Sequence, residues 1–324
     1  MTDPSTSLVQ HHPPSSPSLE LLDDGVHEYR LRSKSANTKR AYASDLAHFE
    51  AWCRERGLVA IPASDVTVCR YLVDHANKLK PSTLQRRLSA ISQAHQTLQF
   101  ESPVAKIAVR QTWAGIKRSV NVRQEGKQPL STADIRRMVA TLPDTPKGVR
   151  DRALLLLGYA GALRRSELVG LATEDVEDTE LGLIILLRRS KTDQEGEGRK
   201  VAIPYGGSLA TCPVRSYRAW LNFRGDCPGA LFPAISRHGQ IGTLKMTAQS
   251  VALVVKHTAA SAGLEQAKFA GHSLRAGHAT TAAAAGVSER AIVKTTGHRS
   301  TEMVRRYIRD GELFRENSGS SLGL

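Results

Sequence analysis

The chain is 324 residues long, 40% of its residues are hydrophobic, and its formal net charge is +14. This length suggests two domains, and the composition allows each of them to bury an ordinary core. A protein with such an excess of basic residues is expected to meet a polyanion, and nucleic acid is the first candidate. The alternative is a surface that is merely basic.

The sequence argues against a membrane-spanning or a secreted protein. No segment approaches the roughly 18 apolar residues of a membrane span, and no basic segment followed by an apolar one marks a secretory signal. The cysteines Cys53, Cys69, Cys212 and Cys227 lack zinc-ligand spacing and are typical of a reduced, intracellular chain. We therefore expect a cytoplasmic, nucleoid-associated protein that needs no metal, no cofactor and no membrane partner.

The first 120 residues divide into a tail and a helical domain. Residues 1–18 are rich in Ser, Pro, Thr and His, carry almost no charge, and should be disordered. Over residues 19–120 apolar residues recur at helical spacing, which predicts a small all-α bundle. The predicted helix starts are Ser35 or Asn37, Asp65, Pro81 with Ser82, and Pro103.

Positive charge is concentrated between residues 78 and 123, mainly on two of the predicted helices. Nine basic residues stand there against one acidic residue, Glu101. The basic residues are Lys78, Lys80, Arg86, Arg87, Lys106, Arg110, Lys117, Arg118 and Arg123. This excess predicts a face that contacts DNA phosphates, and a solvated helix surface is the alternative.

A second domain follows a short polar segment. Residues 121–128 are polar and without periodicity, so we interpret them as the interdomain linker. The second domain, residues 129–316, begins with a helix capped by Ser131, and Asp134 stands three residues later, close to a capping box. An apolar helix follows, and a second, short helix starts at Arg165.

The middle of the second domain has the pattern of a β-hairpin. Residues 183–187 and 200–204 are rich in β-forming side chains and flank a charged turn at residues 190–199. From Cys212 onward the pattern is again mostly helical, and residues 317–324 should be a loose tail. The predicted fold class is therefore mainly α with a small antiparallel β-sheet.

Six side chains of the second domain have the chemistry that cleaves a phosphodiester without a metal. They are Arg164 in Gly-Ala-Leu-Arg-Arg-Ser-Glu-Leu, Lys191 in Arg-Arg-Ser-Lys-Thr-Asp, His272 and Arg275 in Gly-His-Ser-Leu-Arg-Ala-Gly, and His298 and Tyr307 in Gly-His-Arg-Ser-Thr-Glu-Met-Val-Arg-Arg-Tyr-Ile. Cleavage requires charge to be offset on the non-bridging oxygens, the nucleophile to lose a proton and the leaving oxygen to gain one. Arginine suits the first task, because its fork donates two hydrogen bonds to phosphate and keeps its charge.

The positions of the histidines and the tyrosine add to this interpretation. His272 and Arg275 stand three residues apart, which puts them on one face of a helix. A phenol has a pKa near about 10, so Tyr307 needs neighbouring imidazole or guanidinium groups to act as a nucleophile. His298, nine residues before Tyr307, is such a group.

The order of these motifs resembles that of the tyrosine recombinase (phage integrase) family, in particular its simple two-domain members such as Cre and the Xer recombinases. The resemblance covers roughly residues 20–315. On the residues alone, Arg165 competes with Arg164 for the role of phosphate clamp. The family pattern Gly-x-Leu-Arg-x-Ser-Glu-Leu implies Arg164, with Glu167 as an acidic residue that orients the site.

The resemblance implies a role for most of the other candidates. Tyr307 attacks the phosphate and forms a 3′-phosphotyrosine, and His272 accepts its proton or, when charged, donates to the phosphate. Arg275 is implied as the second phosphate clamp. His298 is implied to donate a hydrogen bond to the phosphate.

The general acid for the leaving 5′-oxygen is a separate question. The resemblance implies Lys191, at the turn of the predicted hairpin. A lysine with a pKa near about 10 is a poor acid until burial and neighbouring arginines lower that pKa. Arg188, Arg189 and Lys200 compete with it for this role, because the register of the hairpin is not readable from the sequence.

For the whole molecule, the resemblance implies an N-terminal helical, SAM-like domain that binds the core DNA site and a C-terminal mixed α/β catalytic domain. The implied partner is double-stranded DNA with an inverted-repeat core site, bound by a homodimer, with a homotetramer in synapsis. Strands are exchanged through a Holliday junction without ATP or metal. A type IB topoisomerase, a telomere resolvase and a non-catalytic DNA-binding regulator are the competing functions.

Overall fold

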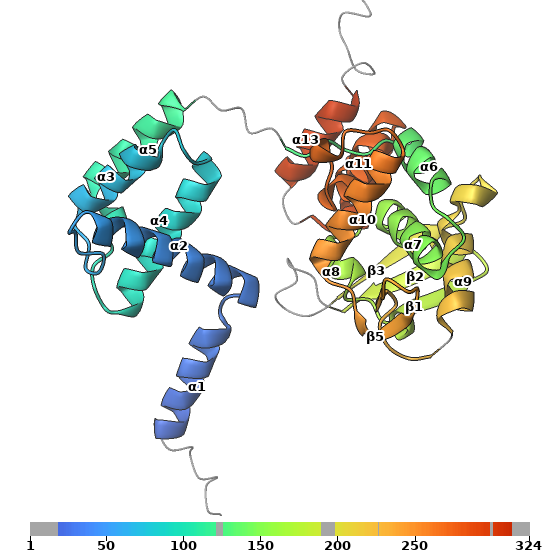
Figure 1. Cartoon of the computed structure of the whole chain (residues 1–324), viewed down its shortest axis with the longest axis horizontal. Coiled ribbons are helices and arrows are strands. Elements are labelled where there is room, and N and C mark those ends of the chain that lie inside the picture. Colours follow the sequence, from blue (N-terminus) through green and yellow to red (C-terminus); the bar gives the residue numbers. More distant parts are fainter. Residues whose placement is uncertain (1–18, 121–125, 189–197, 226, 299–300, 313–324) are drawn as a thin grey trace, which may run out of the picture. The chain divides into compact units, whose positions relative to one another are not determined.

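The structure is a computed structural model of the chain (Figure 1). It describes residues 19–120, 126–188, 198–225, 227–298 and 301–312. The chain divides into two compact units, Met1–Gln124 and Glu125–Leu324, and their boundary lies inside the predicted linker. The predicted tails and most of the linker lie outside the described residues, so the limits given to them stay predictions.

The first unit is an all-helical bundle, as the sequence predicts. Its helices are α1 (Leu19–Arg32), α2 (Ala36–Glu55), α3 (Asp65–His75), α4 (Pro81–Thr97) and α5 (Ile107–Ser119) (Figure 1). Helix α2 packs against α4, and α3 packs against α5. Their core includes Phe49, Trp52, Tyr71, Ile91 and Trp113. The bundle thus buries apolar side chains from α2, α3, α4 and α5 in one core.

Details of these helix starts differ from the sequence prediction. Ser35 caps α2, and Ser64, not Asp65, caps α3, because in each case the serine hydroxyl accepts a hydrogen bond from the N–H three residues later. Pro103 begins only a short 3-10 turn, and α5 starts at Ile107. Helix α1 is not marked as a separate helix by the sequence.

The second unit combines helices with two small antiparallel sheets. Its helices are α6 (Thr132–Ala140), α7 (Pro146–Ala160), α8 (Arg165–Leu168), α9 (Pro213–Arg224), α10 (Ala248–Ser261), α11 (His272–Ala284), α12 (Glu289–Thr296) and α13 (Thr301–Glu312). Helix α7 is central, since all side chains from Ala153 to Leu157 are buried and it packs against α9 and α11. The predicted capping box at Ser131 and Asp134 is present at the start of α6.

The strands extend beyond the predicted hairpin. One sheet has the order β1 (Val176–Thr179), β2 (Gly182–Leu187), β3 (Arg199–Pro204), and the other pairs β4 (Pro233–Ile235) with β5 (Ile241–Lys245). The predicted hairpin is β2–β3, with Leu187 opposite Arg199, so Arg199 belongs to a strand and not to the turn. The expectation of a single small sheet is wrong, because a second sheet, β4–β5, lies within the mostly helical part after Cys212. Strands β1, β4 and β5 are short and lack alternating apolar residues.

Three chemical features of the described residues complete the fold. No helix in this part of the chain has the length and apolar character needed to cross a membrane. The same residues hold no cluster of three or more His, Cys, Asp or Glu side chains arranged for a metal ion. The four cysteines are free thiols, and Cys53 and Cys212 are buried.

Candidate active site

The turn between α7 and α8 carries the first arginine. Ala162 has a left-handed backbone (φ +49°), and its carbonyl oxygen accepts a 2.8 Å hydrogen bond from Nη1 of Arg275 on α11. Arg164 stands just before α8, with a side chain that is 16% exposed. The side chain of Arg165 packs instead against Gly271, where a Cβ atom would lie 2.2 Å from Cδ of Arg165. The structure therefore distinguishes two arginines that the sequence leaves equivalent.

Glu167 joins Arg164 to another guanidinium, that of Arg199. The Glu167 carboxylate is 1% exposed and accepts hydrogen bonds from the backbone N–H (2.8 Å) and Nη1 (2.5 Å) of Arg164. Nη2 of Arg199 lies 3.6 Å from the same carboxylate. Nη2 of Arg164 also donates to the carbonyl oxygen of Gly297 at 3.3 Å. Because a buried carboxylate needs such partners, Glu167 fixes the position of Arg164.

Tyr307 and His272 meet where α13 packs against α11. Oη of Tyr307 lies 2.8 Å from Nε2 of His272. Helix α13 is held there by Val304, which is buried in a cluster with two alanines of α11. The two backbones approach closely, since a Cβ atom on Gly311 would lie 2.5 Å from a carbonyl oxygen of α11. The tyrosine is therefore held with its hydroxyl at an imidazole nitrogen.

His298 stands directly after α12. Gly297 ends that helix in a left-handed conformation (φ +61°), which turns the chain toward α13. Nδ1 of His298 lies 2.8 Å from Oγ1 of Thr296, and this buried hydroxyl also donates to the carbonyl oxygen of Ile292 at 2.8 Å. The ring centres of His298 and Tyr307 are 6.3 Å apart. The end of α12 thus fixes the second imidazole beside the tyrosine.

Burial and positive charge lower the pKa of several groups here. Burial, followed by three nearby guanidinium groups, lowers the pKa of His272 from its usual 6.5. Burial, followed by the same kind of charges, lowers the pKa of His298 to about 3 and that of Arg275 to about 9. At pH 7 His272 is therefore neutral and able to take a proton from Tyr307, while Arg275 stays charged.

Two guanidinium groups of this site, those of Arg275 and Arg199, keep buried donors that are not satisfied by the described residues. Arg275 is 1% exposed, and its Nη2 has no hydrogen-bond partner among them. Nε and Nη2 of Arg199 are also buried and have no hydrogen-bond partner among the described residues. A buried donor without an acceptor is costly, so a ligand that supplies acceptor oxygens and negative charge fits beside Nη2 of Arg275.

The structure does not place the predicted general acid. Lys191 and its competitor Arg189 lie outside the described residues. Arg188 donates from Nε to Asp175 at 2.5 Å, and Lys200 is exposed on β3. The role of Lys191 therefore stays a prediction.

Arg199 is a residue of this site that the sequence motifs do not contain. Burial alternates along β3, and Arg199 shares the inward face with the buried residues Val201 and Ile203. An arginine at an inward position of a strand is the sequence signal that could have identified it.

Known protein families match both units. Residues 128–312 match the Phage integrase family, and residues 28–101 match the Phage integrase, N-terminal SAM-like domain. The chain belongs to the phage integrase family. The first match contains all six predicted catalytic positions, and the second contains α2, α3 and α4.

Several relatives of this chain are recombinases. The chain is 39% identical over 292 residues to the integrase/recombinase XerD homolog of Selenomonas ruminantium. The matched residues cover 89% of this chain and 85% of that protein. It is 33% identical over 214 residues to the tyrosine recombinase XerC of Xanthomonas campestris pv. campestris, covering 64% of this chain and 61% of that one. Its fold is similar to that of the XerH recombinase bound to palindromic difH (TM-score 0.66, 17% identity, 87% of this chain and 79% of that chain). The protein is a Xer-like tyrosine recombinase, from a family of enzymes that cleave and rejoin DNA.

The predicted basic face of this recombinase lies on α4, α5 and the residues just before them. Lys80, Arg110 and Arg118 are exposed and form no ion pair with any residue of the described ranges. Lys117 is also exposed, and its Nζ lies 5.6 Å from the centre of the Trp113 ring. These side chains keep their positive charge available to a polyanion.

Other members of the basic face are paired with carboxylates. The pairs are Lys78 with Asp74 at 2.5 Å, Lys106 with Glu101 at 2.7 Å, and Arg86 with Asp45 at 2.6 and 3.0 Å. Asp45 and Asp74 precede the basic segment in the sequence, so the charge of that segment alone overstates the unpaired excess. Arg123 lies outside the described residues.

Arg87 has a different position from the rest of the predicted face. It is 8% exposed, its Nη1 donates to Oη of Tyr71 at 2.7 Å, and its Nε lies 3.6 Å from Asp45. Burial raises the pKa of Tyr71 to about 12, so this phenol stays protonated. Because Asp45, Tyr71 and Arg87 come from α2, α3 and α4, the contacts join three helices inside the bundle.

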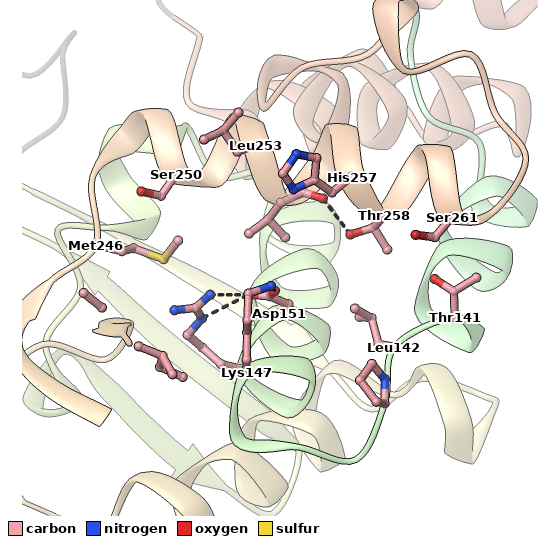
Figure 2. Close-up of a pocket in the computed structure, with 15 residues that line it drawn as sticks. Thr141, Leu142, Lys147, Asp151, Met246, Ser250, Leu253, His257, Thr258 and Ser261 are labelled. Atoms are coloured by element: carbon pink, nitrogen blue, oxygen red, sulfur yellow. Dashed lines mark hydrogen bonds and ion pairs between the residues drawn. The ribbon is translucent and has the colours of Figure 1, made fainter. Parts of the chain in front are cut away.

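A cavity of about 440 Å³ in the catalytic unit is not part of this site (Figure 2). Its walls include residues of α7 and α10, among them Asp151, His257 and Thr258. The Asp151 carboxylate is held by Lys147 at 3.1 Å and by Arg150 at 2.6 Å. None of the described catalytic candidates lines this cavity.

Proposed function

We propose that this recombinase cuts and rejoins DNA at specific sites through seven residues of its second unit. They are Arg164, Lys191, His272, Arg275, His298 and Tyr307, with Glu167 in support. The observation that carries the proposal is the 2.8 Å contact between Nε2 of His272 and Oη of Tyr307, beside buried guanidinium groups. A hydroxyl, a neutral base and fixed cations are what metal-free phosphoryl transfer requires.

Cleavage begins at Tyr307. Its hydroxyl passes its proton to Nε2 of His272 while the phenolic oxygen attacks phosphorus, and a 3′-phosphotyrosine forms. His272 suits this role at pH 7, because its pKa lies below the usual 6.5. The packing of α13 on α11 supports the step, since it holds the two reacting groups in position before DNA binds.

Positive charge then offsets the charge of the phosphate. Arg275 contributes its buried Nη2, and Arg164 contributes the guanidinium that Glu167 orients. In this proposal His298 donates a ring N–H to the phosphate; burial first and positive neighbours second lower its pKa, and a bound phosphate offsets only the second cause. These contacts strengthen as negative charge grows on the non-bridging oxygens, and this accelerates the step.

The leaving 5′-oxygen takes its proton from Lys191, a role that rests on the family resemblance. Religation is the reverse: a 5′-hydroxyl attacks the phosphotyrosine, and the phenolic oxygen leaves and recovers its proton. One phosphodiester forms for each one broken, so neither ATP nor a metal ion is consumed.

The substrate in this proposal is double-stranded DNA with an inverted-repeat core site. Two protomers bind one site, and two such dimers form a tetramer that exchanges strands through a Holliday junction, in the cytoplasm at the nucleoid. Similar solved structures support this assembly, because they show XerH on a palindromic difH substrate, a lambda integrase dimer on a COC′ core site and a lambda integrase tetramer on a Holliday junction. The basic face of the helical unit would contact phosphates and set the register.

The experiment that tests the chemistry starts from a duplex that the wild-type protein selects from a random pool. The duplex is nicked near its centre to trap the intermediate and is incubated with protein in EDTA. We expect an SDS-resistant protein–DNA band for the wild type and none for Tyr307→Phe, with equal DNA binding by both. A band in Tyr307→Phe would show that another residue is the nucleophile.

A plasmid with two copies of the selected site separates recombination from relaxation. Recombinant circles are expected. Relaxed circles alone would favour a type IB topoisomerase, and hairpin ends would favour a telomere resolvase.

A further inference from the structure

Arg199, the first residue of β3, reaches the end of α12. Its Nη1 donates to the carbonyl oxygen of Thr295 at 2.6 Å. Thr295 lies in the last turn of that helix, where carbonyl groups lack partners within the helix, so Arg199 caps it. The guanidinium also lies against Gly297, where a Cβ atom would stand 2.7 Å from Nε. Glycine is therefore favoured at this position by its positive φ, and a side chain there would displace the Arg199 guanidinium.

The same guanidinium shares Glu167 with Arg164. Nη2 of Arg199 lies 3.6 Å from Oε2 of Glu167, and Nη1 of Arg164 donates to Oε1 at 2.5 Å. Arg164 in turn donates to the carbonyl oxygen of Gly297. The contacts thus form a closed ring that begins and ends at the turn just before His298.

Charge balance within this ring affects the phosphate clamp. Arg164 and Arg199 are two guanidinium groups on one buried carboxylate, Glu167. If Arg199 were absent, Arg164 would be the remaining partner of that carboxylate in the ring, and a larger share of its charge would be neutralised. The printed contacts of Arg199 are with the carbonyl oxygen of Thr295 and the carboxylate of Glu167, so it is placed to act through these two neighbours.

We propose that Arg199 is a positioning residue of this active site, which fixes the turn that carries His298 and leaves the charge of Arg164 available to the scissile phosphate. The inference rests on the function proposed above for Arg164 and His298. It extends the active site to β3, the strand that follows the predicted position of the general acid.

The test compares Arg199→Met and Arg199→Lys with the wild type. The matched control is Arg218→Met, which removes an exposed arginine that pairs with Asp178 at 2.7 and 2.8 Å on another surface of the same unit. Three quantities are measured: the rate of covalent adduct formation at saturating protein on the nicked duplex, the Kd for DNA, and the melting temperature.

We expect Arg199→Met to slow adduct formation by about 10- to 100-fold, because misplacement of a catalytic group has effects of this size. Its Kd should stay within about threefold of that of Arg218→Met, because in this proposal Arg199 acts through Thr295 and Glu167 and not on DNA. Arg199→Lys keeps the charge but cannot bridge Thr295 and Glu167, so its rate should be intermediate. A wild-type rate in Arg199→Met would overturn the proposal.

A double-mutant cycle with Glu167→Gln detects the part of the effect that passes through Glu167. The carboxylate is gone in that background. Adding Arg199→Met should therefore slow adduct formation by a factor at least about threefold smaller than the factor in the wild type. An equal slowing of adduct formation in both backgrounds would contradict the proposal that Arg199 and Arg164 share the charge of Glu167. A merely structural role of Arg199 predicts that equal slowing. If Arg199→Met does not fold, the same cycle is read with Arg199→Lys.

Failure of this inference is distinct from failure of the proposed function. If the wild type forms no Tyr307-dependent adduct, the proposed function is wrong. If the wild type forms the adduct and the Arg199 variants form it equally fast, only the role of Arg199 is wrong.

Discussion

Arginines are placed in opposite ways in the two units. In the catalytic unit Arg275 is 1% exposed and keeps a buried donor that the described residues do not satisfy, whereas Arg110 and Arg118 on the helical unit are exposed. A buried guanidinium is fixed in advance and poorly screened, so it acts strongly on one developing charge. An exposed one is screened by salt and can act on any phosphate within reach. One strongly basic sequence therefore serves both catalysis and DNA binding.

Arg87 shows that the helical unit also contains a third kind of arginine. It is buried between the Asp45 carboxylate and the Tyr71 phenol, and it joins helices instead of facing solvent. Position along the sequence does not separate it from Arg86, its exposed neighbour. The comparison between the units can be tested by substituting one arginine of each kind.

The largest effect is expected for Arg275→Ala. Loss of a preorganised donor to the charged oxygens should slow adduct formation about 10³-fold at saturating protein, while Kd changes little. Single-turnover cleavage of the nicked duplex measures the rate, and Arg110→Ala is the control that should keep the wild-type rate. If Arg275→Ala mainly weakened binding, buried and exposed arginines would not differ as we propose.

His272→Gln should slow adduct formation about 10²-fold, because the general base is lost. The pKa of His272 is lowered from 6.5, and only its neutral form accepts the proton, so the wild-type rate should persist as the pH falls through 6.5 and decline only below it. The rate of His272→Gln should lack this acidic decline. A decline of the wild-type rate that begins above pH 6.5 would argue against His272 as the base.

Arg87→Met should lower the free energy of unfolding of the helical unit by about 2 kcal/mol, since Asp45 and Tyr71 lose the buried guanidinium and keep Arg86 and His48 as more exposed partners. Urea or thermal unfolding measures this change. The dependence of Kd on salt should stay that of the wild type. A smaller salt slope without loss of stability would instead place Arg87 on the DNA.

The smallest effect is expected for exposed arginines. Arg110→Ala with Arg118→Ala should weaken binding about tenfold at low salt and reduce the slope of log K against log salt by about two, because two phosphate contacts are lost. Stability should stay the same. Wild-type binding itself should fall by orders of magnitude between about 50 and 200 mM salt, and a flat response would contradict the proposed basic face.

Local patterns predicted much of this molecule. Helical spacing predicted the bundle, and motifs identified six catalytic candidates. The structure places five of them. Arg164 and Arg275 are linked through the turn at Ala162, and the two histidines lie around Tyr307. Contacts between distant segments were not readable. Nothing local to Arg86 shows that Asp45, 41 residues earlier, pairs with it, and nothing local to Arg199 shows that it meets Thr295.

The most direct test of the catalytic role of Arg275 removes the charge of the scissile phosphate. A duplex in which a methyl group replaces one non-bridging oxygen is neutral at this position. A guanidinium that offsets phosphate charge therefore stabilises its transition state less. We predict that the defect of Arg275→Ala relative to the wild type shrinks from about 10³-fold on the natural duplex to less than about tenfold on the neutral one. An equal defect on both duplexes would mean that Arg275 supports the fold and does not act on the reacting phosphate.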